Sequence, residues 1–238
     1  MQYIILAAGV GSRLYPYTKN MPKCMVKVTP SETIVERAIR LINLNDKEAD
    51  ITIVLGYQGE TIKQLLGDKC HYIVNPFYKV TNSIASLWFA RNVLKRHQPT
   101  VVLNADIVFS KSLAKEICKE PKESTIYYDS SIQSNGDYNV QELNEYMIVM
   151  GKELDQYSGE YVGITKYPAH EIQCVLDEVD LMVHDDLYDQ WYENALVQMS
   201  LNSTLRFRTV DISDYDWSEI DSIDNLMKIR EIIKREKE

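Results

Sequence analysis

The chain has 238 residues, of which 45% are hydrophobic and 26% are charged, and these values exclude a disordered or fibrous protein. A formal net charge of −9 argues against nucleic acid or an anionic membrane surface as a partner. The longest apolar runs, such as residues 3–10, are far shorter than the roughly 20 residues of a membrane span. A strand predicted from residue 2 leaves no room for a signal peptide, so we expect a cytoplasmic protein.

Apolar periodicity predicts alternating strands and helices up to about residue 120. The strands are expected at 2–7, 51–55, 71–74 and 100–104, and the helices at 32–44, 60–66, 83–95 and 111–119. Ser31 is the expected N-cap of the first helix. Such alternation implies right-handed crossovers and a mainly parallel sheet that is covered by helices on both faces.

After residue 120 the pattern becomes richer in strands. Strands are expected at 124–128, 146–149, 161–166 and 205–211, and helices at 171–181, 187–201 and 223–234. The sequence contains no internal repeat or proline-rich linker, so we expect a single domain over residues 1–238. The predicted fold class is α/β, a Rossmann-like three-layer sandwich with a predominantly parallel, mixed central sheet.

Charged residues are unevenly spread, and cysteines are scattered. Residues 1–30 hold four basic residues and no acid, whereas residues 177–224 hold 13 acids and two arginines. The first segment therefore suits an anion, and the second could hold cations, although most of those acids are expected on a solvated surface. The four cysteines form no C-x-x-C pair, which argues against a zinc site or a redox motif.

A glycine-rich loop follows the first predicted strand. It reads Leu6-Ala7-Ala8-Gly9-Val10-Gly11-Ser12-Arg13-Leu14 and is followed by Pro22-Lys23. Glycines at this place let the backbone approach a ligand and direct N–H groups toward phosphate oxygens. The loop is not a Walker loop, because no G-K-[ST] follows, and it is not the dinucleotide fingerprint, because Leu14 replaces its third glycine.

Two aspartates are candidates for a metal site. Asp106 ends the strand Val101-Val102-Leu103-Asn104-Ala105-Asp106, and Asp221 follows Trp217-Ser218-Glu219-Ile220 just before the last helix. Ligands in open α/β sheets bind beyond the carboxyl ends of strands, where Asp106 is expected. Taken singly, each aspartate is more typical of a helix cap or a turn than of a metal site.

The glycine loop with Arg13 and the Pro22-Lys23 pair resembles the L-A-A-G-x-G-x-R-L and P-K signature of nucleotidyltransferases that make sugar and alcohol diphosphonucleotides. The resemblance implies the fold of the nucleotide-diphospho-sugar transferases. Asp106 and Asp221 resemble the family's G-D and E-I-D elements, whose acids hold Mg²⁺, and Ala105 replaces the glycine. The resemblance therefore implies Mg²⁺ as cofactor, with Asp106 and Asp221 as its ligands.

Further motifs narrow the resemblance within that superfamily. Asn75-Pro76-Phe77-Tyr78, Thr81-Asn82-Ser83 and Ser86-Leu87-Trp88 are similar to the CTP:phosphocholine cytidylyltransferase branch, as are Gly159 to Ile164 and Trp191 to Ala195. The Q-x-x-P-x-G-L-A-x-A stretch of the hexose-1-phosphate branch is absent. The resemblance implies transfer of CMP from CTP to a small phosphomonoester or phosphonate, such as phosphocholine, with release of pyrophosphate.

This resemblance also implies roles for individual residues. Arg13 would bind the β- and γ-phosphates and Lys23 the phosphates around the reacting centre, and no catalytic nucleophile is required. Residues 1–120 would form a nucleotide-binding half, and residues 121–238 an acceptor-binding half. The nucleotide would be held by Leu6, Ala7, Ala8, Gly9, Gly11, Asn82, Ser83 and Ala105.

A quaternary ammonium head on the acceptor would call for aromatic faces backed by an acid. The acceptor-binding candidates are Tyr78, Asn139, Glu160, Trp191, Tyr192, Glu193 and Trp217. Aromatic residues such as these are more often half-buried for packing alone.

Asn139 marks a departure from the family. Related enzymes commonly read D-x-M-K-V where this chain reads Gly136-Asp137-Tyr138-Asn139-Val140. Either a nearby cation such as Lys152 or Lys166 replaces the family's lysine, or the acceptor pocket is retuned for a substrate other than phosphocholine; we favour retuning.

Two alternative functions stay open. One is a sugar-1-phosphate nucleotidyltransferase, and the other is a nucleotide-binding regulatory module that has lost catalysis. The sequence predicts no particular oligomeric state.

Overall fold

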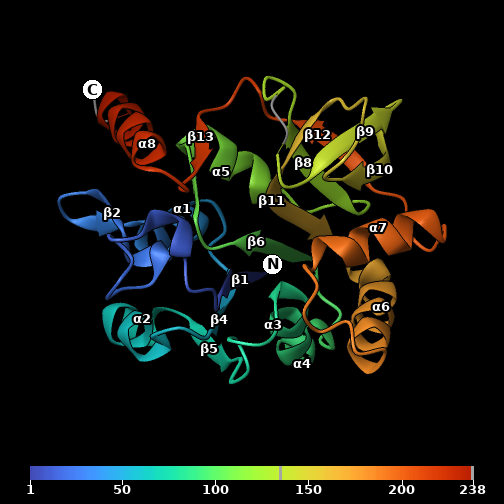
Figure 1. Cartoon of the computed structure of the whole chain (residues 1–238), viewed down its shortest axis with the longest axis horizontal. Helices are drawn as coiled ribbons and strands as arrows, with labels where there is room; N and C mark the ends of the chain where they lie inside the picture. The colour runs from blue at the N-terminus through green and yellow to red at the C-terminus, as the bar shows by residue number, and fades with distance from the viewer. Residues whose placement is uncertain (134–135, 237–238) are drawn as a thin grey trace.

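A nine-stranded sheet runs through the computed structural model, which describes residues 1–133 and 136–236 (Figure 1). Side by side, its strands are β5 (His71–Val74), β4 (Asp50–Leu55), β1 (Gln2–Ala7), β6 (Thr100–Asn104), β11 (Gly159–Tyr167), β8 (Thr125–Asp129), β12 (Arg208–Asp211), β10 (Tyr146–Gly151) and β9 (Asn139–Leu143). The predicted mixed α/β sheet is confirmed.

Parallel pairing is concentrated in the first half of the chain. Strands β5, β4, β1 and β6 are all parallel, whereas β11 is antiparallel to both β6 and β8. Strand β12 lies parallel to β8, and β10 lies antiparallel to β12 and β9. Asn144 and Glu145, both with positive φ, form a two-residue turn between β9 and β10, and such a turn joins antiparallel strands only. Parallel pairing is thus less dominant than the sequence predicted.

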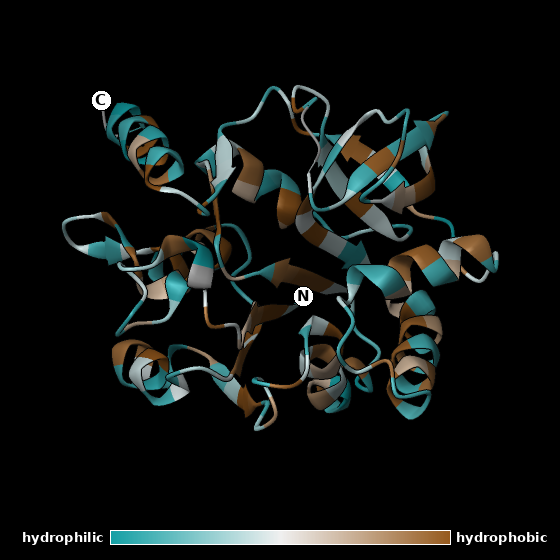
Figure 2. Cartoon of the chain, in the orientation of Figure 1, coloured by the Kyte–Doolittle hydropathy of each residue, from teal (hydrophilic) through white to brown (hydrophobic). Residues whose placement is uncertain are grey.

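Helices cover both faces of the sheet. One face carries α1 (Ile34–Asn45), α2 (Gly59–Leu66) and α5 (Lys111–Ile117), and the other carries α3 (Ser83–Phe89), α4 (Arg91–Leu94), α6 (Ile172–His184) and α7 (Glu193–Leu201). Because side chains alternate along a strand, Tyr3 and Ile5 of β1 pack into the first layer and Ile4 into the second. In Figure 2 the central strands β1 and β6 are brown, and the helices around them alternate between teal and brown along their ribbons. The predicted three-layer sandwich is confirmed.

A third apolar cluster anchors the end of the chain. Helix α8 (Ile223–Arg235) packs Leu226 and Ile229 against Val28 of β2 (Lys27–Thr29) and Val108 of β7 (Ile107–Phe109). Two small antiparallel sheets lie here, one formed by β2 and β3 (Glu32–Thr33) and one by β7 and β13 (Trp217–Glu219). These strands of two or three residues and the hairpin strand β9 were not predicted, because so few residues carry little periodicity.

Several predicted boundaries are wrong. Thr33, and not Ser31, is the N-cap of α1, because Thr33 and Glu36 form a reciprocal capping box. The helix predicted over residues 83–95 is divided at Ala90 into α3 and α4. The helix predicted from residue 187 begins only at Glu193, and the strand predicted from residue 205 begins only at Arg208.

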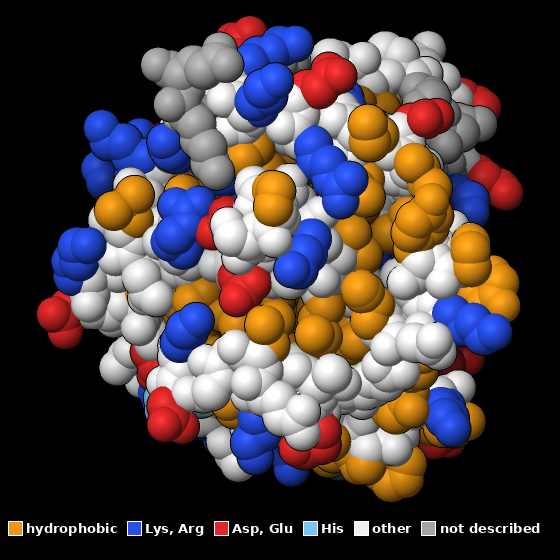
Figure 3. All heavy atoms as spheres, turned by 90° about the vertical axis from the view of Figure 1, so that its left-hand side faces the viewer, with side chains coloured by type: hydrophobic (Ala, Val, Ile, Leu, Met, Phe, Trp, Pro, Cys, Tyr) orange, Lys and Arg blue, Asp and Glu red, His pale blue; other side chains and the backbone are white. Residues whose placement is uncertain are grey.

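On the face shown in Figure 3, lysine and arginine side chains are interspersed with acidic, apolar and uncharged atoms and form no continuous basic stripe. Among the helices of residues 1–133 and 136–236, none combines the length and the apolar character that a membrane crossing requires.

Candidate active site

The carboxyl ends of β1 and β6 form the base of a pocket. Leu6 of β1 is paired with Asn104 of β6, and the next residue, Ala105, donates its backbone N–H to the Leu6 carbonyl at 3.2 Å. Because the two strands are parallel, the glycine loop after β1 and the acid after β6 emerge at the same edge of the sheet. The pocket there has a volume of about 280 Å³, near the lower end of the range for ligand sites.

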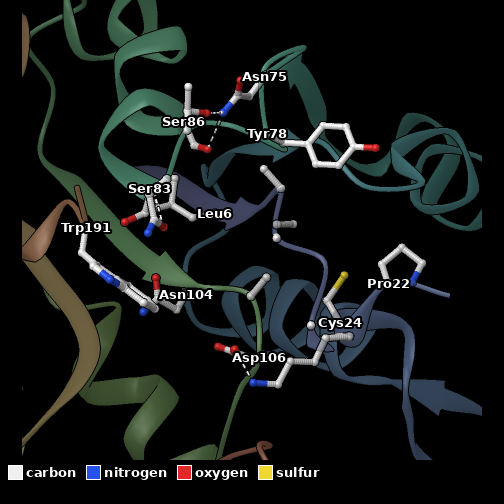
Figure 4. A pocket seen from close by; sticks show the side chains of 18 of the residues that line it. Leu6, Pro22, Cys24, Asn75, Tyr78, Ser83, Ser86, Asn104, Asp106 and Trp191 are labelled. Atoms are coloured by element: carbon white, nitrogen blue, oxygen red, sulfur yellow. Dashed lines mark hydrogen bonds and ion pairs between the residues drawn. The ribbon is translucent and has the colours of Figure 1, made fainter. Parts of the chain in front are cut away.

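Every predicted nucleotide-binding residue lines this pocket, together with both predicted catalytic cations, one predicted metal ligand and two predicted acceptor-binding residues. The predicted residues at its wall are Leu6, Ala7, Ala8, Gly9, Gly11, Arg13, Lys23, Tyr78, Asn82, Ser83, Ala105, Asp106 and Trp191. No site role was predicted for the other lining residues, Pro22, Cys24, Asn75, Thr81, Ser86, Asn104 and Glu219, although all except Cys24 lie in the motifs named above. Figure 4 shows Trp191 and Asn104 on one side of the pocket and Pro22 and Cys24 on the opposite side.

Gly11 allows the loop to pass close over Lys23. Its φ of +67° lies in the left-handed region, and a Cβ at this position would stand only 2.8 Å from the Cβ of Lys23. The Thr18 hydroxyl donates to the Gly11 carbonyl at 2.7 Å and holds the far side of the loop. The glycine therefore brings the loop and the lysine of the P-K pair together.

The two predicted metal acids meet through β7 and β13. Glu219 is paired with Ile107 in this small sheet, and the N–H of Ile220 donates to the carbonyl of Asp106 at 3.1 Å. The pairing places Asp106, which lies two residues after the end of β6, beside the segment that precedes α8. Residues 106 and 221 consequently lie in one site.

Asp106, Glu219 and Asp221 form a carboxylate cluster, with one oxygen from each residue within 4.8 Å of the others. Clustered carboxylate oxygens are the donors that a hard divalent cation such as Mg²⁺ prefers, so the residues fit the metal that the resemblance implies. Sequence reasoning assigned only Asp221 from the E-I-D element. In an extended segment residues i and i+2 lie on the same side, and this spacing was the signal that could have added Glu219.

Lys23 lies within reach of the whole carboxylate cluster. Its Nζ is 2.6 Å from Asp106 Oδ2 and 3.8 Å from Glu219 Oε1, and it also forms an ion pair with Asp221. Burial alone would lower the pKa of Lys23, but the charges of Asp106 and Asp221 outweigh burial and raise it. Burial and the neighbouring carboxylates raise the pKa of Glu219 as well. The ammonium thus compensates the negative charge of the cluster.

Arg13 forms the opposite edge of the charged site. Its Nη1 lies 2.9 Å from Asp137 Oδ2 and 2.7 Å from Asp221 Oδ2, and its Nη2 lies 3.4 Å from Glu219 Oε1. The side chain remains 50% exposed and belongs to the pocket wall. Two cations therefore flank the carboxylate cluster, an arrangement that suits a polyphosphate held together with a metal ion.

The non-helical segment before α7 carries Trp191 to the pocket. Three hydrogen bonds fasten this segment to the start of α3. They run from Asn82 N to the Tyr188 carbonyl at 3.0 Å, from Ile84 N to the Gln190 carbonyl at 3.3 Å and from Tyr192 N to Ser83 Oγ at 2.7 Å. Trp191 is 42% exposed and meets the ring of Tyr138 edge-on at 6.5 Å. Its indole is therefore available to a ligand.

Tyr192 and Glu193 lie behind the pocket wall. Tyr192 is fully buried, with its hydroxyl 2.6 Å from that of Tyr161. Glu193 is 2% exposed, and its Oε1 accepts from Asn104 Nδ2 at 3.4 Å. Its Oε2 has no hydrogen-bond partner in the part of the chain that the structure describes. Burial raises the pKa of Glu193 to about 7.

Glu193→Gln should remove a pH-dependent loss of stability. Because the pKa of Glu193 is higher in the folded state, its protonated carboxyl favours folding. The wild type therefore has its full stability below the unfolded-state pKa of about 4.3, and it loses this contribution as pH rises through about 7. We expect equal unfolding free energies of wild type and variant at pH 4, and at pH 8 a variant more stable by about 3 kcal/mol. Urea denaturation at both pH values measures this, with the exposed Glu153→Gln as control. A stability difference that does not change with pH would contradict it.

Asn139 and Glu160 are not among the residues that line the pocket. Asn139 is fully buried, where it accepts from the N–H of Gly136 at 3.3 Å and donates to the carbonyl of Lys152 at 3.0 Å. Glu160 accepts from the N–H of Asp137 at 3.2 Å. In this structure both residues support the turn over residues 136–139.

Trp217 and the two alternative lysines also lie outside the pocket lining. The indole of Trp217 donates to Asp129 Oδ2 at 2.7 Å. Lys166 is 4% exposed and donates to carbonyls at the end of α5 and just beyond it, which directs it away from the charged site. Lys152 is exposed, with its Nζ 3.9 Å from Asp137 Oδ1, and is therefore nearer to the charged site.

Comparison with known proteins agrees with this geometry. The model of the "Nucleotidyl transferase" family matches residues 2–139. The chain is 28% identical to the CTP:phosphoglutamine cytidylyltransferase of Campylobacter jejuni, with 95% of this chain and 98% of that protein covered. It is 24% identical to the choline-phosphate cytidylyltransferase of Streptococcus pneumoniae, with 99% and 100% covered.

Solved structures show the same fold. A CTP:phosphocholine cytidylyltransferase from Streptococcus pneumoniae matches with a TM-score of 0.80 at 21% identity, covering 98% of each chain. The inositol-1-phosphate CTP transferase of T. maritima matches with a TM-score of 0.77 at 18% identity, covering 100% of this chain and 96% of that one. The architecture is that of the nucleotide-diphospho-sugar transferases, as predicted.

The family model spans the glycine loop, Lys23 and Asp106, which meet at one edge of the sheet. Because it also matches more than half of the chain, the protein belongs to the nucleotidyl transferase family of enzymes.

Proposed function

We propose that this enzyme transfers CMP from CTP to a small phosphomonoester or phosphonate that carries a cationic group, such as phosphocholine, with release of pyrophosphate and dependence on Mg²⁺. The proposal rests on the ion pairs of Arg13 and Lys23 with the carboxylate cluster, of which Asp106 and Glu219 line the pocket and Asp221 lies beside them. Support for CTP comes from the two full-length relatives, both of which are cytidylyltransferases. Such an enzyme draws on the nucleotide pool of the cytoplasm, where we place it.

The reaction is an in-line displacement at the α-phosphorus of CTP. A phosphomonoester is largely ionised at neutral pH, so its oxygen attacks without a protein base. Arg13 binds the β- and γ-phosphates, and Lys23 stabilises the charge that develops around the reacting phosphorus. Asp106, Glu219 and Asp221 would hold the Mg²⁺, which when bound neutralises phosphate charge. The chain's own contribution is positioning and electrostatics.

The polar wall beneath α3 is suited to a nucleobase. Asn75 is 1% exposed and donates to the hydroxyls of both Thr81 and Ser86 at 3.0 Å, so these groups are fixed in place. Asn82 and Ser83 line the same wall and are the proposed contacts of the cytosine edge. Residues 1–120 therefore act in our proposal as the nucleotide-binding half.

The part of the wall that carries Trp191, next to Ser83, is suited to a cationic acceptor (Figure 4). Trp191 presents its exposed indole there, with Tyr138 packed edge-on behind it. An aromatic face attracts a cation through its quadrupole. We propose that residues from 121 onward bind the acceptor at this wall.

A matrix of nucleotides and acceptors tests the proposal. CTP, UTP and dTTP would each be combined with phosphocholine, phosphoethanolamine, 2-aminoethylphosphonate, phosphoglutamine and glucose 1-phosphate, and pyrophosphate release measured with Mg²⁺. We expect CTP with a cationic acceptor to give the highest kcat/KM. Activity confined to glucose 1-phosphate would instead establish a sugar-1-phosphate nucleotidyltransferase. Tight CTP binding without pyrophosphate release across the panel would establish the regulatory module.

A further inference from the structure

The turn over residues 136–139 reaches from the second half of the chain to the glycine loop. Asp137 Oδ2 accepts a hydrogen bond from Arg13 Nη1 at 2.9 Å, and the two residues are 124 positions apart in the sequence. Arg13 is the proposed phosphate-binding arginine, and Asp137 has no assigned role in that reaction. The contact joins the two sides of the site directly.

Glu160 and Asn139 form the hydrogen bonds that support this turn. Asp137 donates its backbone N–H to Glu160 Oε1, while Asn139 accepts from Gly136 N and donates to the Lys152 carbonyl. A Cβ on Gly136 would lie 2.0 Å from Glu160 Oε1, so a larger residue there would displace the Glu160 carboxylate from its present place. The buried amide of Asn139 thus supports the turn, and the carboxylate of Asp137 is presented in a defined place.

Asp137 differs from the other two acids that contact Arg13. Glu219 and Asp221 belong to the carboxylate cluster, whose oxygens fit a divalent cation. Asp137 lies outside that cluster and is 46% exposed. When the cluster binds a cation, Asp137 is therefore the acid that stays available to orient the guanidinium. A guanidinium offers five N–H donors in a planar fork, so one fixed carboxylate leaves the remaining edge for phosphate oxygens.

We propose that Asp137 is a positioning residue for nucleotidyl transfer, which holds the guanidinium of Arg13 in the orientation that meets the nucleotide phosphates. The inference rests on the proposed function for the phosphate contact of Arg13. An exposed ion pair of this kind contributes little to folding stability, so its main effect is on orientation. Misplaced catalytic groups cost rate even when the fold is unchanged.

Three variants separate positioning from loss of charge. Asp137→Asn keeps the shape of the side chain and removes its charge, Asp137→Glu restores the charge, and Asp155→Asn makes the same change at an exposed acid of the second half. We expect Asp137→Asn to lower kcat/KM for CTP about tenfold, a size typical of coupled ionic neighbours. Asp137→Glu should recover part of the loss, and Asp155→Asn should leave kcat/KM and the melting temperature at the wild-type values. An equal loss in Asp155→Asn would overturn the proposal, because it would show a general charge effect.

A double-mutant cycle with Arg13 gives the decisive readout. In an Arg13→Ala background, Asp137→Asn should produce no further loss of kcat/KM, because the group that Asp137 positions is already absent. A further tenfold loss in that background would overturn the proposal.

The same double-mutant cycle can be measured on the affinity for CTP. Calorimetric titration with CTP and Mg²⁺, without acceptor, gives this affinity independently of turnover. A wild type that binds CTP and transfers nothing would refute the proposed function. In that case, loss of CTP affinity in Asp137→Asn, but not in the Arg13→Ala background, would still support the role of Asp137. An unchanged CTP affinity in Asp137→Asn would overturn it.

Discussion

Asp106→Asn and Asp221→Asn should each lower the rate of nucleotidyl transfer by about 10²–10³-fold and leave the fold intact. Each change removes a charged oxygen from the carboxylate cluster, and a hard cation binds amide oxygens much less tightly than carboxylates. The fold should be preserved because the side chains of Asp106 and Asp221 are 22% and 24% exposed. Each change also removes the repulsion between one carboxylate and the other two acids of the cluster. Pyrophosphate release and calorimetric Mg²⁺ titration measure the effects.

The control for this pair is Asp224→Asn, which changes an exposed acid in the first turn of α8 outside the cluster. It should keep wild-type turnover and Mg²⁺ affinity. Glu219→Gln completes the series and should also weaken Mg²⁺ binding. Near-normal activity in either aspartate variant would remove that residue from the metal site.

Lys23→Ala should lower turnover by about 10²-fold and at the same time tighten Mg²⁺ binding in the absence of nucleotide. The rate falls because the ammonium no longer stabilises charge around the reacting phosphorus. Mg²⁺ affinity rises because Lys23 contacts all three acids of the carboxylate cluster and therefore competes with a cation for them. Single-turnover kinetics and Mg²⁺ calorimetry of the nucleotide-free protein measure the two effects separately.

Lys27→Ala serves as the matched control, since Lys27 is an exposed lysine four residues away whose Nζ donates to the Pro30 carbonyl. Both its turnover and its Mg²⁺ affinity should equal those of wild type. If Lys23→Ala altered the Mg²⁺ dependence while turnover stayed at the wild-type level, the role assigned to Lys23 in the reaction would be wrong.

The glycine loop shows what local sequence determines. Its residues follow a buried strand directly, and a turn of this kind depends on backbone freedom at Gly11 and on the strand before it. The pattern of apolar residues likewise determined the helices of the first half and its strands β1, β4, β5 and β6, because burial of one face is a local requirement of each element. The elements that carry the phosphate loop and Asp106 were therefore predictable.

Contacts between distant segments decided the rest of the site. Glu219 joins Asp106 only because β13 pairs with β7, and these strands of three residues leave almost no pattern in the sequence. Asp137 meets Arg13 only after the turn over residues 136–139 has folded onto the first half of the chain.

The neighbours Trp191, Tyr192 and Glu193 also differ through long-range contacts, at the wall proposed for the acceptor. Their residue types are equally suitable for binding a cation, yet of these three only Trp191 lines the pocket. Three hydrogen bonds to the start of α3 hold residues 187–192 outside the helix that periodicity predicted. Tyr192 and Glu193 are directed into the interior instead. Residue type and spacing thus determined which chemistry the chain can perform. The side chains that face the ligand were decided by packing between segments far apart in the sequence, a long-range interaction that no local pattern encodes.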